Sequence, residues 1–220
     1  MGTEVTLGAA GRSGRGYLSE PSLPGPGVVV VPDEFGLLPH VRERCDWLAE
    51  AGFVALAIDL YGGRTAVTPA EAQRLAGGLD LVRSRGLLAT AATQLLARPK
   101  VRPQRIGAVG FGLGGRLALL TATTGALDAI VAFYAVLSPA ERSLVPCPTL
   151  LHLTGGPAEQ DQATRGFLQD LRASGTEVTA RTWSGVPPGF ANADRPGYLE
   201  KPTMAAWVET AGFLAGHLRR

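Results

Sequence analysis

Short apolar runs recur along the chain, and most of them, such as Val28–Val31, do not alternate with polar positions. Runs of this kind are typical of strands that are covered on both faces, as in a parallel sheet. We therefore predict buried strands before Gly110 and at Val28–Val31, Phe53–Ile58, Ala129–Tyr134 and Thr149–Leu153, with a last strand at Val178–Trp183. Residues 4–7 and 16–19 predict a β-ribbon whose turn is marked by Gly11, Gly14 and Gly16.

Segments with helical periodicity separate these strands. Apolar positions from Leu37 to Ala51 repeat with helical spacing, and Thr68-Pro69-Ala70-Glu71 has the form of a capping box before a further helix. Other helices are expected around Ala91–Ala97, Leu117–Leu120, Asp161–Ala173 and Met204–Leu218. This alternation predicts an α/β fold in one domain, residues 1–220, with a mainly parallel sheet, helices on both faces and no separate cap domain.

Composition narrows the class of protein. With 45% hydrophobic and 18% charged residues and a net charge of +2, the chain is expected to be globular, with no nucleic-acid or membrane partner. Its start has no secretion signal, which favours a cytoplasmic location. Cys45 and Cys147 are far apart, and the three histidines follow no ligand pattern, so neither a metal nor a cofactor is expected. A monomer or a homodimer fits these observations.

A glycine-rich turn, Gly110-Phe111-Gly112-Leu113-Gly114-Gly115, joins a predicted strand to a predicted helix. It matches the G-x-G-x-x-G fingerprint of dinucleotide-binding proteins, but that fingerprint belongs to the first βα unit, and at least two units come before this turn. The nearest acidic residue, Asp128, also precedes its strand instead of following it. A second interpretation is close packing of the helix on a strand, although so many glycines exceed what packing alone needs.

The third interpretation is a nucleophile elbow, G-x-Nuc-x-G, whose central residue normally carries the attacking side chain. Gly112 stands at this position and has no side chain. The central residue of an elbow is strained, with a positive φ that glycine adopts at no steric cost. The turn is therefore predicted to persist without its nucleophile.

Motifs over most of the chain resemble the dienelactone hydrolase family of α/β-hydrolases. The matching segments are Val28–Val31, Asp33–Leu37, His40–Arg42, Leu48–Ala49, Ala57–Tyr61, Gly110–Ala118, Ala132–Tyr134, Pro148–His152, Gly189–Ala191 and Asp194–Tyr198. The resemblance implies the α/β-hydrolase fold and a Cys-His-Asp triad. It puts the nucleophile at Gly112, the acid at Pro157 and the histidine at Pro188, so the chemistry is absent from all three positions.

A displaced triad has few candidates. His152 follows an apolar strand and is expected to be a satisfied buried histidine, while His40 opens a helix and His217 lies near the end of the chain. Glu159 or Asp161 offers a displaced acid, but an acid without a histidine orients nothing. Both cysteines are expected to be inert. Ordinary covalent hydrolysis is therefore not expected.

The backbone remains usable at the turn. The resemblance implies an oxyanion hole made by the N–H groups of Leu113 and Glu34. Asp33 and Glu34 follow a strand end and are candidate general acids or bases, or else parts of a solvated loop or helix cap. Candidate substrate-binding residues, with core packing as the alternative for each aromatic, are Gly112, Tyr61, Arg64, Tyr134, Trp183, Pro188 and Phe190. Arg195 is expected to pair with Asp194, or else with a substrate carboxylate.

These features lead to a hypothesis of function. We expect a small carbonyl, lactone or polyketide-like substrate to undergo cyclisation, isomerisation or water addition in the old pocket, without an acyl-enzyme. One alternative is a non-catalytic pseudohydrolase that binds a ligand or a partner protein. Another is a hydrolase with a displaced triad.

Overall fold

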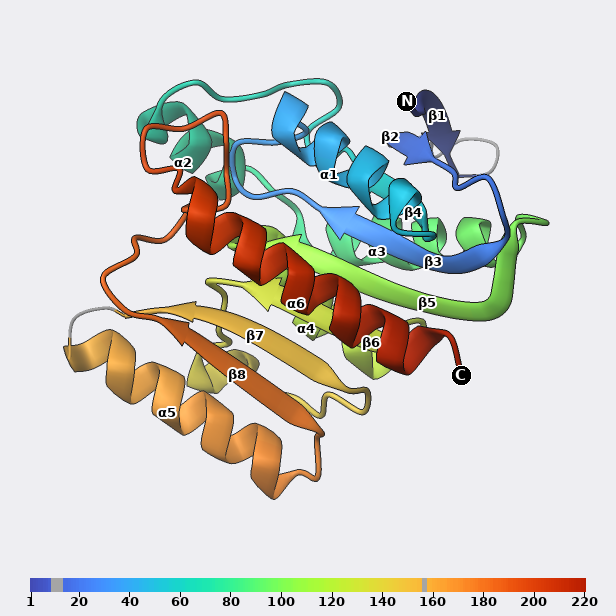
Figure 1. Cartoon of the computed structure of the whole chain (residues 1–220). Helices are drawn as coiled ribbons and strands as arrows, with labels where there is room; N and C mark the ends of the chain where they lie inside the picture. Colours follow the sequence, from blue (N-terminus) through green and yellow to red (C-terminus); the bar gives the residue numbers. More distant parts are fainter. Residues whose placement is uncertain (9–13, 156–157) are drawn as a thin grey trace.

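An eight-stranded sheet forms the centre of the molecule (Figure 1). The computed structural model describes residues 1–8, 14–155 and 158–220, without the side chains of residues 158–161. The strand order is β1-β2-β4-β3-β5-β6-β7-β8, and all neighbours from β4 to β8 pair in parallel, which confirms the predicted mainly parallel sheet. The strands are β1 (Thr3–Leu7), β2 (Gly14–Ser19), β3 (Gly25–Val31), β4 (Val54–Ile58), β5 (Val101–Phe111), β6 (Ala129–Phe133), β7 (Thr149–Thr154) and β8 (Val178–Trp183).

The predicted ribbon at the start of the chain is present as β1 and β2, but its turn is placed wrongly. Gly14 and Gly16 lie inside β2, which pairs antiparallel with both β1 and β4. A Cβ on Gly16 would lie 2.5 Å from the carbonyl oxygen of Ala57, so this glycine allows close strand pairing and not a turn. Gly11 lies outside the described residues.

Helices cover both faces of the sheet, as expected (Figure 1). Helices α1 and α6 pack on one face, and α3, α4 and α5 pack on the other. Among the described helices, none is both long and apolar enough to cross a membrane. The helices are α1 (Pro39–Glu50), α2 (Pro69–Gly77), α3 (Leu81–Leu96), α4 (Leu113–Thr121), α5 (Ala158–Ala173) and α6 (Glu200–Leu218), with short 3-10 turns at Ala122–Thr124 and Pro139–Glu141.

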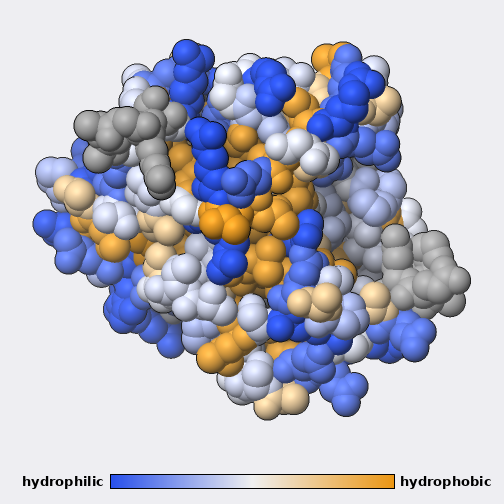
Figure 2. Space-filling view, turned by 180° about the vertical axis from the view of Figure 1, so that it is seen from behind, coloured by the Kyte–Doolittle hydropathy of each residue, from blue (hydrophilic) through white to orange (hydrophobic). Residues whose placement is uncertain are grey.

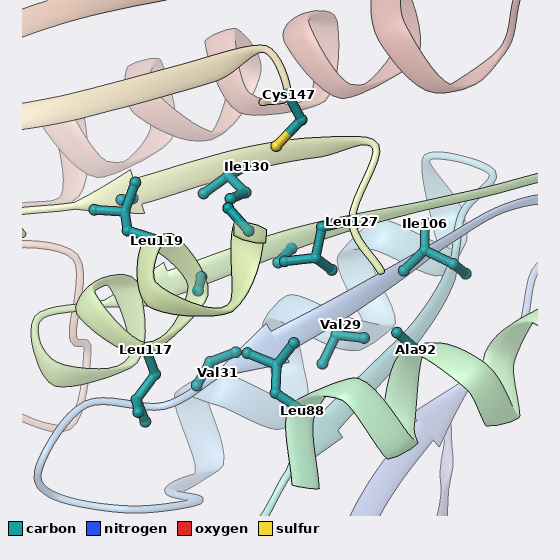
Figure 3. Close-up of a cluster of buried hydrophobic side chains, with 14 of the residues drawn as sticks. Val29, Val31, Leu88, Ala92, Ile106, Leu117, Leu119, Leu127, Ile130 and Cys147 are labelled. Atoms are coloured by element: carbon teal, nitrogen blue, oxygen red, sulfur yellow. The ribbon is translucent and has the colours of Figure 1, made fainter. Parts of the chain in front are cut away.

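Strand β3 divides its side chains between the two faces. Val29 and Val31 pack with α3 and α4, whereas Val28 and Val30 pack with α1 and α6. Figure 3 shows Val31 between these helices, beside Leu88. On the outer side of the α3 and α4 layer, apolar side chains gather in the middle of the face in Figure 2, with polar ones around them. Because both faces of β3 are covered, the strand carries no polar position, as its apolar run predicts.

Three long helices begin earlier than the sequence pattern predicts. Helix α3 starts at Leu81, where the Asp80 carboxylate accepts the N–H of Arg83 (3.0 Å), and the exposed Gly86 obscures the apolar periodicity of this part. Helix α6 starts at Glu200 and has Pro202 in its first turn, where the missing N–H costs nothing. Helix α5 also begins before its predicted start.

The predicted capping box is confirmed at the start of α2. The Thr68 hydroxyl accepts the N–H of Glu71 (3.3 Å), and the Glu71 carboxylate accepts the N–H of Thr68 (3.0 Å). Helix α2 follows the loop at the carboxyl end of β4, and this loop borders the candidate site.

Candidate active site

The turn between β5 and α4 has the backbone geometry of a nucleophile elbow. Gly112 has φ +48° and ψ −112°, a conformation that residues with a Cβ rarely adopt. Its N–H donates to the carbonyl oxygen of Phe133, and its own carbonyl oxygen accepts the N–H of Arg116, both at 3.0 Å. The positive φ expected at this position is confirmed.

The other glycines of the turn are required by packing. A Cβ on Gly114 would overlap the carbonyl oxygen of Val31, and a Cβ on Gly110 or Gly115 would lie within 2.8 Å of a neighbouring atom. Helix α4 therefore begins in close contact with the backbone of β3 and β5. Packing thus accounts for three of the four glycines and not for Gly112, so the expectation that packing alone does not explain the turn is confirmed.

Asp128 lies at the amino ends of the parallel strands, directly before β6, whereas the elbow lies at their carboxyl ends. Its carboxylate accepts the N–H of Ile106 (2.8 Å) and pairs with Arg105 (2.6 Å), near the amino end of β5's paired segment. Dinucleotides bind at the carboxyl ends of strands, where an acidic residue holds the ribose. The structure thus agrees with setting the dinucleotide interpretation aside.

Glu34 lies directly over the elbow. A Cβ placed on Gly112 would have Glu34 Oε2 as its nearest neighbour, at 3.2 Å, followed by ring atoms of Tyr134 at 3.7 and 3.8 Å. The Glu34 carboxylate therefore fills space that the side chain of a nucleophile would use. Within the described part of the chain, the N–H groups of Glu34 and Leu113 have no acceptor, and Leu113 is the first residue of α4. Both predicted oxyanion donors are thus unused.

Asp33 is buried beside Glu34 and is not part of a solvated loop. Its Oδ1 accepts the N–H of Phe35 (2.9 Å), and its Oδ2 accepts the Nδ2–H of Asn192 (3.0 Å). Burial, followed by the negative charge of Glu34, raises the pKa of Asp33 from 3.8 to about 6. Two neighbouring carboxyl groups with different environments thus lie at the elbow.

Two tyrosines, Tyr61 and Tyr134, lie near the carboxyl groups of Asp33 and Glu34. The hydroxyls of Tyr61 and Tyr134 are buried, and neither has a hydrogen-bond partner among the described residues. Burial and then the charges of Asp33 and Glu34 raise the pKa of both hydroxyls, which are therefore protonated donors. Tyr134 also has φ +41°, which is strained for a residue with a large side chain. The charges of both carboxyl groups thus act on both hydroxyls.

The remaining predicted aromatics, Phe190 and Trp183, pack in a row that starts at Tyr134. Phe190 is fully buried, with its ring 6.0 Å from that of Tyr134 and 5.8 Å from that of Trp183. Trp183 is partly buried, and its Nε1–H donates to Nδ1 of His152 (3.3 Å). Core packing, the alternative stated for each aromatic, therefore describes Phe190. Pro188 is exposed on the loop after β8.

Arg64 lies apart from the residues around Gly112. It lines a hollow of about 500 Å³ together with Arg15 and Arg42, between β1, β2 and the turn after β4. Neither Glu34 nor Gly112 lines this hollow. The Nε–H of Arg64 donates to the carbonyl oxygen of Tyr61 (3.2 Å).

Sequence reasoning missed Asn192 and misplaced Arg195. Asn192 is fully buried and binds Asp33; its position just after the Gly189–Ala191 motif is the only signal in the sequence. Arg195 does not pair with Asp194. Its guanidinium carbon lies 3.6 Å from the centre of the Phe35 ring, it has no carboxylate partner among the described residues, and its charge acts on Asp33.

All the histidines of the chain are described, and each has a polar partner outside the elbow, although Nε2 of His40 has none among the described residues and its ring lies 6.2 Å from that of Phe111. Nδ1 of His40 donates to Asp194 (2.8 Å), and His217 lies 3.7 Å from Glu177. His152 is a satisfied buried histidine, as expected, because Nδ1 accepts from Trp183 and Nε2–H donates to Thr210 Oγ1 (3.1 Å). The side chains of Glu159 and Asp161 lie outside the described residues.

The cysteines also fit the expectation that they are inert. Cys45 packs among α1, α6 and the sheet, and Cys147 packs beside β6 (Figure 3). Burial raises the pKa of both thiols, that of Cys147 to about 11. Neither thiol is a ready nucleophile, because the thiolate is the reactive form.

Asp33 is expected to make stability depend on pH. Its folded pKa of about 6 exceeds the unfolded value, so its stabilisation is complete below about pH 4 and is lost as the pH rises through 6. The loss amounts to about 3 kcal/mol. Urea unfolding of the protein and of Asp33→Asn should give free energies whose difference shrinks by this amount between about pH 4 and pH 7. His152, with its pKa lowered by burial to about 4, acts in the opposite direction but cancels in the comparison. A difference that does not vary with pH would contradict the shift at Asp33.

Comparison with known proteins identifies relatives over the whole chain. The model of a family described as "Dienelactone hydrolase family" matches residues 15–218. Carboxymethylenebutenolidase 1 of Cupriavidus pinatubonensis is 30% identical, with 97% of this chain and 96% of the relative covered. A "Probable 2-oxo-3-(5-oxofuran-2-ylidene)propanoate lactonase" of Bradyrhizobium is 27% identical, with coverage of 97% and 94%. The solved structure of a dienelactone hydrolase-like promiscuous phosphotriesterase from metagenomic libraries matches with a TM-score of 0.84, 26% identity and coverage of 99% and 98%.

These relatives correct the function expected from the sequence. The expectation of cyclisation, isomerisation or water addition is wrong, because the relatives named for an activity include carboxymethylenebutenolidases and a lactonase, which are hydrolases. The alternatives of a pseudohydrolase and of a displaced triad gain no support from them. The missing side chain at Gly112 underlies that expectation, and the Glu34 carboxylate lies in the space that such a side chain would use.

Proposed function

This chain belongs to the dienelactone hydrolase family, and on that premise we propose that it hydrolyses the ester bond of a small lactone. In this proposal water is the nucleophile and Glu34 is the general base. The observation that carries it is the position of Glu34 Oε2, 3.2 Å from the point where a nucleophile's Cβ would stand on Gly112. A carboxylate at that point can take a proton from a water molecule aimed at a carbonyl carbon above the elbow.

The proposed reaction needs no covalent intermediate. Water attacks the lactone carbonyl carbon while Glu34 takes its proton, and the oxyanion that forms accepts the N–H groups of Leu113 and Glu34. The tetrahedral intermediate then collapses, the ring C–O bond breaks, and the proton on Glu34 passes to the leaving oxygen. The products are a carboxylic acid and an alcohol or enol.

Further side chains suit a lactone that carries a carboxylate. The Tyr61 and Tyr134 hydroxyls are unpaired donors among the described residues, and the Arg195 guanidinium lacks a carboxylate partner there. An anionic substituent would satisfy Arg195, since a guanidinium binds carboxylate through paired N–H groups. The propanoate lactone in the name of the Bradyrhizobium relative is of this class. We therefore extend the proposal to carboxylate-bearing butenolides.

Hydrolysis in oxygen-18 water tests this proposal. We expect turnover of a carboxylated butenolide, faster than that of its methyl ester, with the label in the product acid and no change in the mass of the protein. A p-nitrophenyl ester should give no initial burst, because no acyl-enzyme accumulates. A burst with an acylated protein would contradict the mechanism, and labelled Glu34 would make the carboxylate a nucleophile instead of a base. Failure to hydrolyse any member of a lactone panel would overturn the proposal.

A further inference from the structure

A chain of hydrogen bonds connects the buried carboxyl group at the elbow to the start of α1. The Asn192 amide donates from Nδ2 to Asp33 Oδ2 (3.0 Å) and accepts at Oδ1 from the N–H of Asp194 (3.0 Å). The Asp194 carboxylate in turn accepts from the N–H (2.9 Å) and from Nδ1 (2.8 Å) of His40. Two segments that are remote in the sequence, one between β3 and the start of α1 and one between β8 and α6, thus meet at one buried amide.

The orientation of the Asn192 amide is determined by its partners. Asp194 offers a backbone N–H, which requires the amide oxygen on that side, so the NH₂ group must face Asp33. A flipped amide would place two donors together at one end and two acceptors together at the other. Asn192 therefore always presents a donor to Asp33.

The hydrogen bond from Asn192 favours the ionised form of Asp33, which the other surroundings of this side chain largely disfavour. The charged and titratable groups that act on Asp33 or are acted on by it are Glu34 on its own loop, Arg195 on the loop before α6, Tyr134 after β6 and Tyr61 after β4. Burial and Glu34 oppose ionisation, and the Arg195 charge is the weakest of the favourable contributions. Among the described residues, Asn192 is the one side chain that donates a hydrogen bond to Asp33.

We infer that Asn192 is a positioning residue of the active site: its amide holds Asp33 as a carboxylate, and the charge of Asp33 keeps the Glu34 carboxylate turned toward Gly112. This inference rests on the proposed role of Glu34 as the general base. Two carboxylates on adjacent residues repel each other, so an ionised Asp33 favours the arrangement in which Glu34 points away from it. A protonated Asp33 removes that repulsion and lets Glu34 leave the elbow.

The isosteric variant Asn192→Asp tests the inference. It keeps the acceptor for Asp194 but replaces the donor by a carboxylate oxygen, so one of the two facing acids must hold a proton. In the original protein, the unfolding free energy falls with rising pH until Asp33 is fully ionised. In Asn192→Asp we expect this fall to end at a pH about two units higher. The acid limb of kcat/KM should move upward with it, with kcat reduced more than KM is raised. Gln73→Glu, an amide-to-acid change on an exposed part of α2, is the matched control and should move neither profile.

An exchanged pair separates positioning from simple structural support. Asp33→Asn combined with Asn192→Asp restores a donor and an acceptor between the two positions but removes the charge from position 33. We expect this double variant to recover most of the stability lost in Asn192→Asp and little of its activity. Recovery of both would mean that the hydrogen bond alone matters, and it would overturn the inference.

The stability measurement also separates this inference from the proposed function. A stability profile that Asn192→Asp leaves unchanged overturns the inference, whatever the activity. A profile that moves as expected supports the link between Asn192 and Asp33 even if no lactone is hydrolysed, in which case only the proposed function fails.

Discussion

Replacing Glu34 by glutamine is expected to lower kcat/KM for lactone hydrolysis by about 100- to 10,000-fold, the usual contribution of a general base. Glutamine has the size of glutamate and can still fill the space above Gly112, but its amide cannot take a proton from water. The N–H of residue 34 remains in place, so the backbone donors are unaffected. Steady-state kinetics with the best butenolide of the panel, at a pH above the pKa of Asp33, measures the loss.

Two further variants make this experiment specific. Glu43→Gln removes a carboxylate from an exposed position on α1 and should leave kcat/KM within about twofold of the original. Glu34→Asp keeps the charge but draws the carboxylate back by one methylene, so its activity should lie between those of the original protein and Glu34→Gln. Full activity in Glu34→Gln would exclude Glu34 as the base.

Gly114→Ala is expected to destabilise the protein by about 3 kcal/mol or more, a large share of the stability of a typical domain. The added Cβ would overlap the carbonyl oxygens of Val31 and Pro32. These are backbone atoms at the end of a central strand, so no flexible side chain can move aside. Helix α4 would have to retreat from β3, and the packing at the elbow would loosen. Urea unfolding followed by circular dichroism measures the change.

The same substitution at another helical glycine provides the control. Gly86 lies inside α3 with nothing within 4 Å of the position of a Cβ. Gly86→Ala should therefore stabilise the protein by about 0.5–1 kcal/mol, because alanine favours helix without meeting a neighbour. Equal effects of Gly86→Ala and Gly114→Ala would show that helix propensity, and not the contact with β3, determines the outcome.

Local patterns predicted the elements that carry strong local signals. The unalternating Val28–Val31 run marked a strand buried on both faces, and the Thr68 capping box marked the start of α2. The start of α3 was missed because Gly86 and several exposed residues weaken the apolar periodicity there. The sequence pattern does not distinguish Gly14 and Gly16 from turn residues, because glycine serves equally in a turn and at a close contact between strands. Only the neighbouring strand distinguishes these two uses.

The candidate site divides in the same way. Gly112 and the strand-turn-helix around it were recognisable from the sequence, since the elbow is formed by consecutive residues. Glu34 and Asp33 were identified as following a strand end, but their different burial was not predictable. Arg64 was grouped with the site because it follows the same kind of strand end, although its side chain lines a separate hollow. The partner of Arg195 was also misjudged, because a neighbouring charge in the sequence need not be a neighbour in space.

The sequence by itself determined the α/β class, the place of the elbow and the positive φ at Gly112, because each depends on residues close together in the chain. Only the tertiary structure decided that Glu34 lies over Gly112 and that Asn192 binds Asp33 across 159 positions. These contacts arise because the strand order places the carboxyl ends of β3 and β5 side by side, and the loop between β8 and α6 returns to them. Hydrophobic periodicity carries no information about the strand order or about the path of that loop.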